Sequence, residues 1–328
     1  MHSPAFWAKG GWLPFVLGPM GLLWGLGGWL RRAFIKPYRA AIPVICVGNL
    51  VVGGAGKTPV TLAIAHHLRG KGINVHLLGR GYGGEYGDRL KGPTKVDPAR
   101  HLAAEVGDEA LLLAAAAPTW VGADRAAAAR AAAAAGAACV VLDDGFQDPS
   151  LEKDLSLLVV DGAYGFGNGR VVPAGPLREP VAAGLQRAQA VVLVGQDEAG
   201  VGESLAGQGR LLRAQLVPAS DMAERQGDRF LAFAGIGRPE KFFASLRKAG
   251  FTLAGTRAFP DHHVYRREEV EALVRDAESL GALPITTAKD AVRLPEDFRD
   301  RVIVFPVRLV WQDVDAVETL LRPLFRSP

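Results

Sequence analysis

The sequence predicts an α/β protein, in which a P-loop domain with a doubly wound, mostly parallel sheet is joined to a second, smaller α/β domain and to an N-terminal hydrophobic helical arm. Three observations support this fold class. Short apolar runs alternate with helical stretches along most of the chain, which is the pattern of a parallel sheet covered by helices. A glycine-rich loop follows the first of these runs, and an uncharged segment rich in tryptophan precedes it.

The length of 328 residues suits two domains with an appendage. We expect a membrane-associating arm at residues 1–39, a P-loop domain at 40–225, and a smaller domain at 226–328 that closes over the site. A change in composition near residues 218–228 marks the linker. The net charge of +4 is too small to indicate nucleic-acid binding, but it is compatible with an acidic substrate or an anionic membrane surface.

The arm has an unusual composition. Residues 10–30 carry no charge, and four of the six tryptophans (Trp7, Trp12, Trp24 and Trp29) lie at or near this stretch. The length would just span a bilayer, but seven glycines and two prolines disfavour a straight membrane helix. We therefore favour one or two helices lying in the membrane surface, with the basic residues after Leu30 meeting anionic lipid. A spanning helix and an arm packed on the protein's own core are the alternatives.

The arm is followed by an apolar run at 43–47, a glycine-rich loop and an amphipathic helix. Glycines let the loop curl so that several backbone N–H groups point at one anion, and the helix adds the positive end of its dipole. This arrangement predicts a nucleotide-phosphate site, in which Lys57 reaches the terminal phosphates and the Thr58 hydroxyl binds Mg²⁺. The predicted cofactor-binding residues are Val52, Gly53, Gly54, Ala55, Gly56, Lys57 and Thr58.

The loop departs from the common P-loop pattern at its first position, where Val51 replaces glycine. It is closer to the x-G-G-x-G-K-T variant of P-loop proteins related to partitioning ATPases. Those proteins carry a signature lysine where this chain has Val52. The variant leaves open whether the loop serves a kinase or a nucleotide-dependent switch.

Polar residues follow several of the later apolar runs, and in an open α/β sheet such positions line the ligand crevice. Arg80 and Tyr82 follow the run at 73–78. Asp143 and Asp144 follow the run at 138–142, where adjacent carboxylates indicate the acidic side of a phosphate and metal site. Asp108 and Glu109 open a helix, where a carboxylate can act either as a dipole partner or as a general base.

The second half repeats the α/β pattern on a smaller scale, with strands expected at 230–236, 253–259, 284–287 and 302–310. An Asp-His-His sequence at 261–263 and a Thr-Ala-Lys-Asp sequence at 287–290 follow two of these strands. An imidazole beside a carboxylate base can hold it deprotonated, provided that the second domain faces the P-loop across a cleft. His262 and His263 are both candidates for this imidazole.

The ordered set of motifs resembles the tetraacyldisaccharide 4′-kinase family, whose members phosphorylate the lipid A precursor. The resemblance runs from the arm to about residue 310. Its motifs are V-G-N-L-V-V-G-G-A-G-K-T-P at 47–59, G-R-G-Y at 79–82, V-G-D-E at 106–109, D-D-G-F-Q at 143–147, P-A-G-P-L-R-E-P at 173–180, F-P-D-H-H at 259–263 and T-A-K-D at 287–290.

The resemblance implies a role for each of these motifs. Asp108 resembles the family's catalytic base, His262 its partner from the second domain, and Lys57 the catalytic lysine. Thr58, Asp143 and Asp144 resemble the metal side of the ATP site, with either aspartate open as the Mg²⁺ ligand. The residues in the remaining site motifs are assigned to substrate binding; they are Arg80, Tyr82, Arg125, Gln147 and Arg178.

The resemblance therefore implies an ATP- and Mg²⁺-dependent kinase that acts on the 4′-hydroxyl of a lipid-linked disaccharide 1-phosphate. We expect a monomer at the cytoplasmic face of the inner membrane, with no nucleic-acid partner. The rival hypothesis is a membrane-bound P-loop ATPase switch that acts on a protein partner. That hypothesis accounts for the loop and the arm, but it leaves the second α/β domain without a role.

Overall fold

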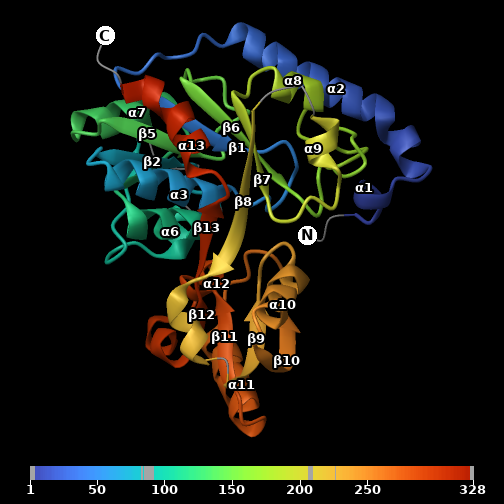
Figure 1. Ribbon diagram of the computed structural model, residues 1–328, viewed down its shortest axis with the longest axis vertical. Coiled ribbons are helices and arrows are strands. Elements are labelled where there is room, and N and C mark those ends of the chain that lie inside the picture. Colours follow the sequence, from blue (N-terminus) through green and yellow to red (C-terminus); the bar gives the residue numbers. More distant parts are fainter. Residues whose placement is uncertain (1–3, 83, 85–91, 206–209, 226, 326–328) are drawn as a thin grey trace.

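The computed structural model describes residues 4–82, 84, 92–205, 210–225 and 227–325. A large α/β domain carries a long helical arm along its upper edge, and a smaller α/β domain lies below it (Figure 1). β8 (Arg210–Pro218) and β13 (Val307–Trp311) pair with each other and run side by side toward the smaller domain (Figure 1). The predicted fold class is confirmed, including the arm.

A nine-stranded sheet forms the larger domain, and all of its pairs are parallel except the one at each edge. The strand order is β13 (Val307–Trp311), β8 (Arg210–Pro218), β7 (Ala190–Val194), β6 (Leu155–Asp161), β1 (Val44–Gly48), β5 (Cys139–Asp143), β2 (Val75–Gly79), β4 (Thr119–Val121) and β3 (Thr94–Lys95). β1 lies between β5 and β6, and the strands that follow β1 in the sequence lie on both sides of it. The loop after β1 therefore opens at a topological switch point, where ligands bind in open α/β sheets.

Helices cover both faces of this sheet, as the doubly wound prediction requires. One face is packed against α3 (Lys57–Gly70), α6 (Asp108–Ala116) and α13 (Val314–Leu321). The other is packed against α7 (Arg125–Ala134), α8 (Val181–Leu185) and α9 (Val201–Ser204). The short α5 (Ala103–Val106) precedes α6. Cys46 and Cys139 are buried as free thiols in the central strands β1 and β5.

The smaller domain holds a four-stranded parallel sheet in the order β10 (Thr252–Ala258), β9 (Arg229–Ala234), β11 (Leu283–Thr287) and β12 (Ile303–Phe305). Its core lies on both faces of the sheet. On one face, α10 (Pro239–Lys248) buries Phe242, Phe243 and Leu246. On the other, α11 (Arg267–Ser279) and η2 (Glu296–Arg301) cover the sheet; α12 (Ala288–Ala291) and η1 (Ser220–Arg225) complete the domain.

The last predicted strand, at 302–310, is in fact two strands in different sheets. Pro306 has no backbone N–H, and it separates β12 in the smaller sheet from β13 in the larger one. After β13, Val317 and Leu321 of α13 are buried in the core of the larger domain. The chain from 307 onward thus lies with the larger sheet, whereas the sequence placed everything after 226 in the smaller domain.

The arm consists of α1 (Phe6–Lys9) and α2 (Leu13–Phe34). α2 continues through Pro19 without the break that the sequence suggested, and Pro14 lies in its first turn, where the missing N–H costs no hydrogen bond. Gly21 faces the Val171 carbonyl so closely that a Cβ would lie 2.9 Å from the oxygen, which explains one of the glycines. The indole of Trp7 donates to the Pro173 carbonyl and helps to hold the arm on the loop before α8.

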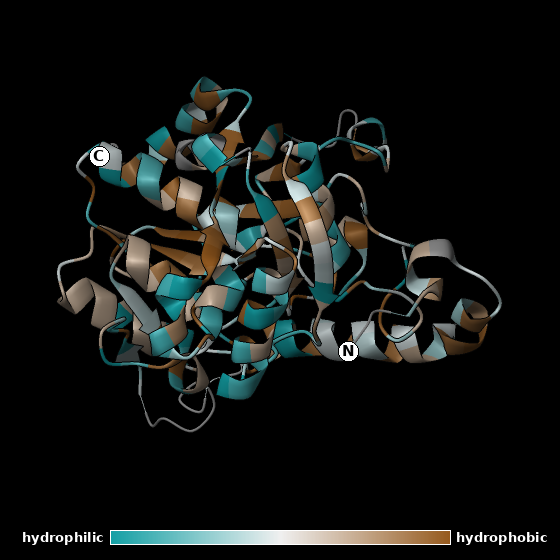
Figure 2. Ribbon diagram, turned by 90° about the horizontal axis from the view of Figure 1, so that it is seen from below, coloured by the Kyte–Doolittle hydropathy of each residue, from teal (hydrophilic) through white to brown (hydrophobic). Residues whose placement is uncertain are grey.

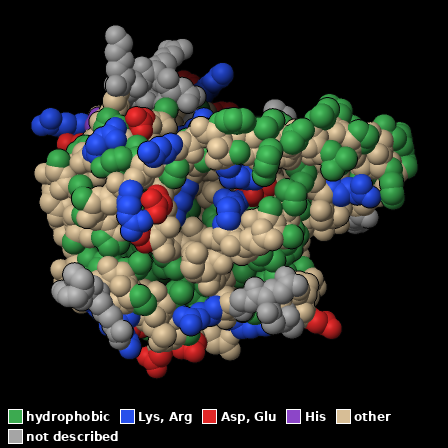
Figure 3. Space-filling model, turned by 90° about the horizontal axis from the view of Figure 1, so that it is seen from above, with side chains coloured by type: hydrophobic (Ala, Val, Ile, Leu, Met, Phe, Trp, Pro, Cys, Tyr) green, Lys and Arg blue, Asp and Glu red, His purple; other side chains and the backbone are tan. Residues whose placement is uncertain are grey.

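Most of α2 is exposed. Its apolar side chains gather along the projecting part of the molecule, as Figures 2 and 3 show. The helix is long and apolar enough to cross a membrane by length and composition, and only a small share of its apolar stretch is buried. The exposed apolar side chains include Trp12, Phe15, Leu22, Leu23, Trp24, Trp29 and Phe34.

Candidate active site

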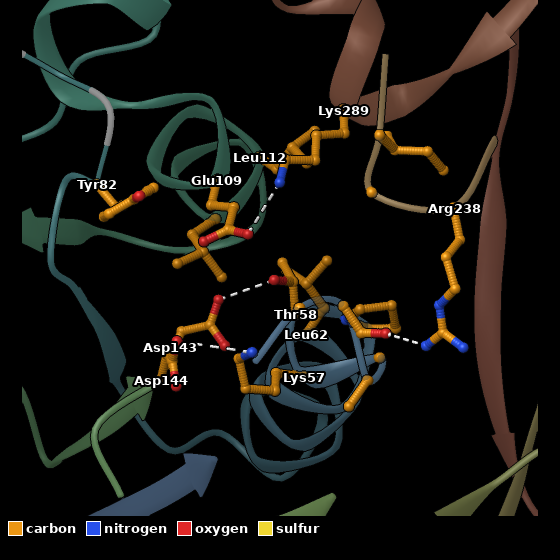
Figure 4. Close-up of a pocket in the computed structure, with 18 of the residues that line it drawn as sticks. Lys57, Thr58, Leu62, Tyr82, Glu109, Leu112, Asp143, Asp144, Arg238 and Lys289 are labelled. Atoms are coloured by element: carbon orange, nitrogen blue, oxygen red, sulfur yellow. Dashed lines mark hydrogen bonds and ion pairs between the residues drawn. The ribbon is translucent and has the colours of Figure 1, made fainter. Parts of the chain in front are cut away.

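A cavity of about 2090 Å³ lies between the two domains. The larger domain lines it with the loop after β1, the ends of β2 and β5, and the start of α6. The smaller domain lines it with the loops after β9, β10 and β11. A pocket for one small molecule measures roughly 300–1,000 Å³, so this cavity has room for more than one substrate. Figure 4 shows the part of it around the loop after β1.

The glycine loop forms one wall of this cavity. All of residues 52–58, which the sequence predicts to bind the nucleotide, line it. Gly53 and Gly56 have φ of 109° and 87°, a conformation that side chains rarely adopt, and the space beside Gly53 and Gly54 is open. Gly56 immediately precedes α3, so the N-terminus of that helix faces the cavity. The loop can therefore hold phosphate groups on backbone N–H groups.

Val51 does not damage this loop. It forms an antiparallel bridge with Leu177 and is buried in the core on one face of the sheet. In the common P-loop this position holds a glycine, but here the backbone is extended and a branched side chain fits it. The departure from the pattern is therefore a local packing feature.

Lys57 is held by a polar network at the base of the loop. Its ammonium group lies 3.3 Å from the Asn49 side-chain oxygen, to which it donates, and 3.6 Å from an Asp144 carboxylate oxygen. Arg178 grips the same carboxylate with two hydrogen bonds, at 2.7 and 3.1 Å, and also donates to Gln147. Burial alone would raise the pKa of Asp144, but Lys57 and Arg178 outweigh it and hold the pKa below its ordinary value.

Asp143 has a different environment, although it adjoins Asp144. Its buried carboxylate accepts hydrogen bonds from Thr58, at 2.9 Å, and Thr61, at 3.0 Å. Burial, together with the charge of Glu109, raises its pKa to about 7 against the opposing charge of Lys57. Asp143 is thus short of positive charge, whereas Asp144 is already paired. Of the two candidates, the carboxylate beside the Thr58 hydroxyl is the better placed to meet a cation.

Asp108 lies at the start of α6 and faces the smaller domain. One of its carboxylate oxygens is 3.0 Å from His262 Nδ1 and 3.3 Å from Arg293 Nε, and the Lys289 ammonium group lies 3.9 Å away. Burial raises the pKa of Asp108, but the hydrogen bond from His262 and the nearby positive charges outweigh burial and leave the pKa below its ordinary value. Since an ionised carboxylate can only accept, Nδ1 of His262 carries the hydrogen in this pair.

The contacts of the two candidate histidines distinguish them. His262 reaches across the cavity to Asp108, while His263 turns away, pairs with Glu269 at 3.2 Å and stacks on Phe259. The ring of Tyr82 meets that of His262 edge-on at 5.8 Å. The structure therefore brings His262, and not His263, to the predicted base.

Backbone strain gathers at the same place. Among the described residues, the non-glycine residues with positive φ are Asp144 and His262, at 56° and 58°. Such a conformation costs about 1–3 kcal/mol and persists where surrounding contacts hold it. Arg178 and Lys57 hold Asp144, and Asp108 holds His262. Both strained residues thus present their side chains to the cavity.

The residues predicted to bind substrate fall into two groups. Arg80, Tyr82, Gln147 and Arg178 line the cavity with polar or aromatic groups. Arg125 also borders it, but its guanidinium is buried and donates to the carbonyls of Gly79 and Gly122. The contacts of Arg125 support the turn that carries Arg80 rather than an open binding position.

Sequence reasoning missed a second set of contacts between the domains. Asp161 ends β6 and is buried, and it accepts from Arg238, at 2.9 Å, and Lys241, at 2.7 Å, both of the smaller domain. The position of Asp161 at a strand end was visible in the sequence. Its partners lie 77 and 80 residues further on, without a motif to connect them.

Comparison with known proteins identifies the family. The family described as tetraacyldisaccharide-1-P 4′-kinase, LpxK, matches residues 13–326. The chain belongs to this family. Two curated relatives named tetraacyldisaccharide 4′-kinase come from Rhodospirillum centenum, 54% identical over 99% of this chain and 97% of the relative, and Paramagnetospirillum magneticum, 52% identical over 99% and 98%.

A solved LpxK structure has the same fold. The LpxK of Aquifex aeolicus in complex with ATP matches with a TM-score of 0.77 and 26% identity, over 96% of this chain and all of that one. The resemblance inferred from the ordered motifs is therefore confirmed for the 4′-kinase family as a whole. Which residue performs which task in this chain stays a prediction, supported by the contacts described above.

Proposed function

We propose that this chain transfers the γ-phosphate of ATP to the 4′-hydroxyl of a tetraacyl disaccharide 1-phosphate in lipid A biosynthesis. One observation carries the proposal: the P-loop of the larger domain and His262 of the smaller domain line the same cavity, and His262 lies 3.0 Å from the buried carboxylate of Asp108. Phosphoryl transfer needs a bound donor, a positioned hydroxyl and a group that takes its proton. The membership of the 4′-kinase family supplies the class of donor and acceptor.

The donor side suits ATP and Mg²⁺. The loop at 52–58 offers its backbone N–H groups and Lys57 to the phosphates. Thr58 and Asp143 fit a magnesium ion, because a hydroxyl and a buried carboxylate adjoin each other and the carboxylate has too little positive charge around it. A bound magnesium ion would neutralise the charge that develops on the transferred phosphoryl group. We propose that Asp143 is the ligand, since Arg178 and Lys57 already neutralise Asp144.

The acceptor side suits a general base. Asp108 is ionised and can take the proton of an attacking hydroxyl as the new bond to phosphorus forms. His262 orients the carboxylate through Nδ1, while Lys289 and Arg293 keep it charged. These three groups come from the smaller domain, so the base is set for reaction only when the two domains lie together.

The arm suits a lipid acceptor. Exposed apolar patches of this size on a soluble protein mark an interaction surface, and tryptophans prefer the headgroup region of a membrane. Arg31 and Arg32 end the helix and would meet anionic headgroups. We propose that the arm binds the cytoplasmic face of the inner membrane, and that the chain acts as a monomer because both walls of the cavity come from one chain.

The test is a phosphate-transfer assay with a tetraacyl disaccharide 1-phosphate in mixed micelles, using ATP labelled in the γ-position. We expect label in the lipid product, at the 4′-position, and none when the lipid is left out. Removal of Mg²⁺ by a chelator should abolish transfer. Absence of labelled lipid with the wild-type chain would overturn the proposal.

The rival hypothesis, a P-loop switch acting on a protein, predicts a different result in the same assay. A switch would hydrolyse ATP at its full rate without lipid. The hydrogen-bonded side chains of Asp108 and His262 would then have no substrate hydroxyl to deprotonate. Membership of the 4′-kinase family also does not favour this hypothesis.

A further inference from the structure

The two domains also meet at Asp161, away from the proposed base. Asp161 lies at the carboxyl end of β6, beside β1 in the sheet, and its side chain is 3% exposed. It accepts hydrogen bonds from Arg238, which immediately precedes α10, and from Lys241 in the first turn of that helix. One buried carboxylate is thus paired with two cations.

The charges at this contact do not balance. Asp161 carries one negative charge, whereas Arg238 and Lys241 carry two positive charges between them. Lys57, the cation of the loop itself, shares the Asp144 carboxylate with Arg178. Arg238 and Lys241 are 40% and 49% exposed and both line the cavity, so the surplus positive charge faces the space beside the loop. A surplus cation in a cavity attracts an anion.

Arg238 touches the phosphate cradle itself. The same terminal nitrogen that pairs with Asp161 donates to the Gly54 carbonyl at 2.8 Å, and Figure 4 shows the side chain extending from the smaller domain toward the loop. Gly54 lies at the open part of the loop, where the surrounding space is empty. The guanidinium also lies over the Tyr164 ring at 5.0 Å, which restricts its position. It therefore lies at the edge of the place that the phosphates would occupy.

We propose that Arg238 is a phosphate-binding residue for the nucleotide, supplied to the P-loop by the smaller domain. The inference rests on the proposed function, because it takes ATP as the donor. When phosphates occupy the loop, the guanidinium turns from the Gly54 carbonyl to a phosphate oxygen, an acceptor that carries charge. Lys241 stays on Asp161 and keeps this buried carboxylate paired.

The proposal gives the nucleotide a part in assembling the site. ATP bound by both the loop and Arg238 would tie the smaller domain to the larger one. The same domain carries His262, so donor binding would favour the arrangement in which His262 meets Asp108.

The test measures nucleotide affinity without lipid acceptor, by calorimetry on the full-length chain with Mg²⁺. Arg238→Ala should weaken ATP binding by roughly tenfold or more, the effect of one hydrogen bond to a charged group, and reduce its dependence on salt. Arg238→Lys should recover part of the affinity. Lys248→Ala, which removes a like charge from the exposed far end of the same helix, should bind ATP as the wild type does.

The Asp161→Asn variant tests whether Arg238 binds phosphate or only links the two domains through its ion pair with Asp161. Both Arg238→Ala and Asp161→Asn break the ion pair, but only the first removes the cation from the cradle. Asp161→Asn should therefore bind ATP at least as tightly as the wild type. Equal weakening in both variants, or an Arg238→Ala variant that matches Lys248→Ala, would overturn the inference. A wild-type chain that does not bind ATP would instead refute the proposed function, and the inference would fall with it.

Discussion

Each of the two contacts between the domains is built on one buried carboxylate of the larger domain, but the groups around that carboxylate differ in kind and in exposure. At Asp108, a buried carboxylate faces an imidazole, an ammonium group and a guanidinium, and its pKa is lowered as a result. At Asp161, a buried carboxylate faces two exposed cations, one of which also touches the P-loop. The first contact keeps a base ionised, and the second holds a cation beside the phosphate cradle.

The difference separates the tasks of the smaller domain. On the roles proposed above, its loops after β10 and β11 serve the acceptor hydroxyl through Asp108, while the loop after β9 serves the donor through Arg238. If this division is right, changes at the first contact reduce turnover without weakening ATP binding. Changes at the second contact reduce nucleotide affinity first.

The largest effect is expected for Asp108→Asn. The amide keeps the shape of the side chain but cannot take the proton, so kcat should fall on the order of 10²- to 10⁴-fold. The affinity for ATP should stay at the wild-type value, because Asp108 lies on the acceptor side. Steady-state transfer assays and ATP calorimetry on the same preparation check both parts. A variant with near-normal kcat would remove Asp108 from the role of base.

His262→Gln should have the next largest effect. The variant loses the hydrogen bond that orients Asp108, and a hydrogen bond to a charged group is worth about 1.5–3 kcal/mol, or roughly 10- to 100-fold in kcat. His263→Gln is the matched control, since His263 pairs with Glu269 and faces away from the cavity. Equal losses in the two variants would indicate damage to the loop after β10 in place of a specific contact.

The dependence of kcat on pH tests the contact between His262 and Asp108 in a second way. A general base acts when deprotonated, so a lowered pKa of Asp108 extends activity toward lower pH. In His262→Gln, the imidazole no longer counteracts the effect of burial on Asp108, so the pKa of Asp108 should rise. The acidic limb of the kcat profile should therefore move to higher pH. Measurements of kcat at saturating substrates over the acidic range check the direction of the shift. An unshifted limb would show that His262 does not control the charge of Asp108.

The smallest effect is expected where the arm meets the site. Arg32 at the end of α2 lies 3.2 Å from the buried Glu179, which also contacts Gln147. Glu179 keeps its ion pair with Arg187 when Arg32 is lost. Arg32→Gln should therefore lower the free energy of unfolding by about 1 kcal/mol or less and leave kcat in micelles unchanged. Thermal unfolding and the transfer assay check this, and a large loss of kcat would make the arm a third contact that controls the site.

The local parts of the site could be predicted from the sequence. The strand, the loop and the helix around Lys57 form one contiguous run of the chain. Strand ends such as Asp143 could be placed at the crevice because parallel strands bring their carboxyl ends to one edge.

Contacts between distant segments could not be predicted. The ion pair between Arg238 and Asp161 depends on how the two domains are placed, and no sequence motif connects the two residues. The choice between His262 and His263 depends on a positive φ, which a sequence of two adjacent histidines does not reveal. At Pro306 the chain passes from the smaller sheet to the larger one. The sequence does not show this change of sheet, because the residues before and after Pro306 are similarly apolar.

The path of the chain makes the smaller domain an insertion. It leaves the larger sheet at the end of β8 and returns at the start of β13, where Pro218 pairs with Val307 and the Ala219 N–H donates to the Pro306 carbonyl. Two strands joined by a ladder of hydrogen bonds resist sliding past each other, so β8 and β13 hold the two connections to the smaller domain together. A short turn from Pro218 to Val307 would turn β8 and β13 into a hairpin, and would make the larger domain a separable module.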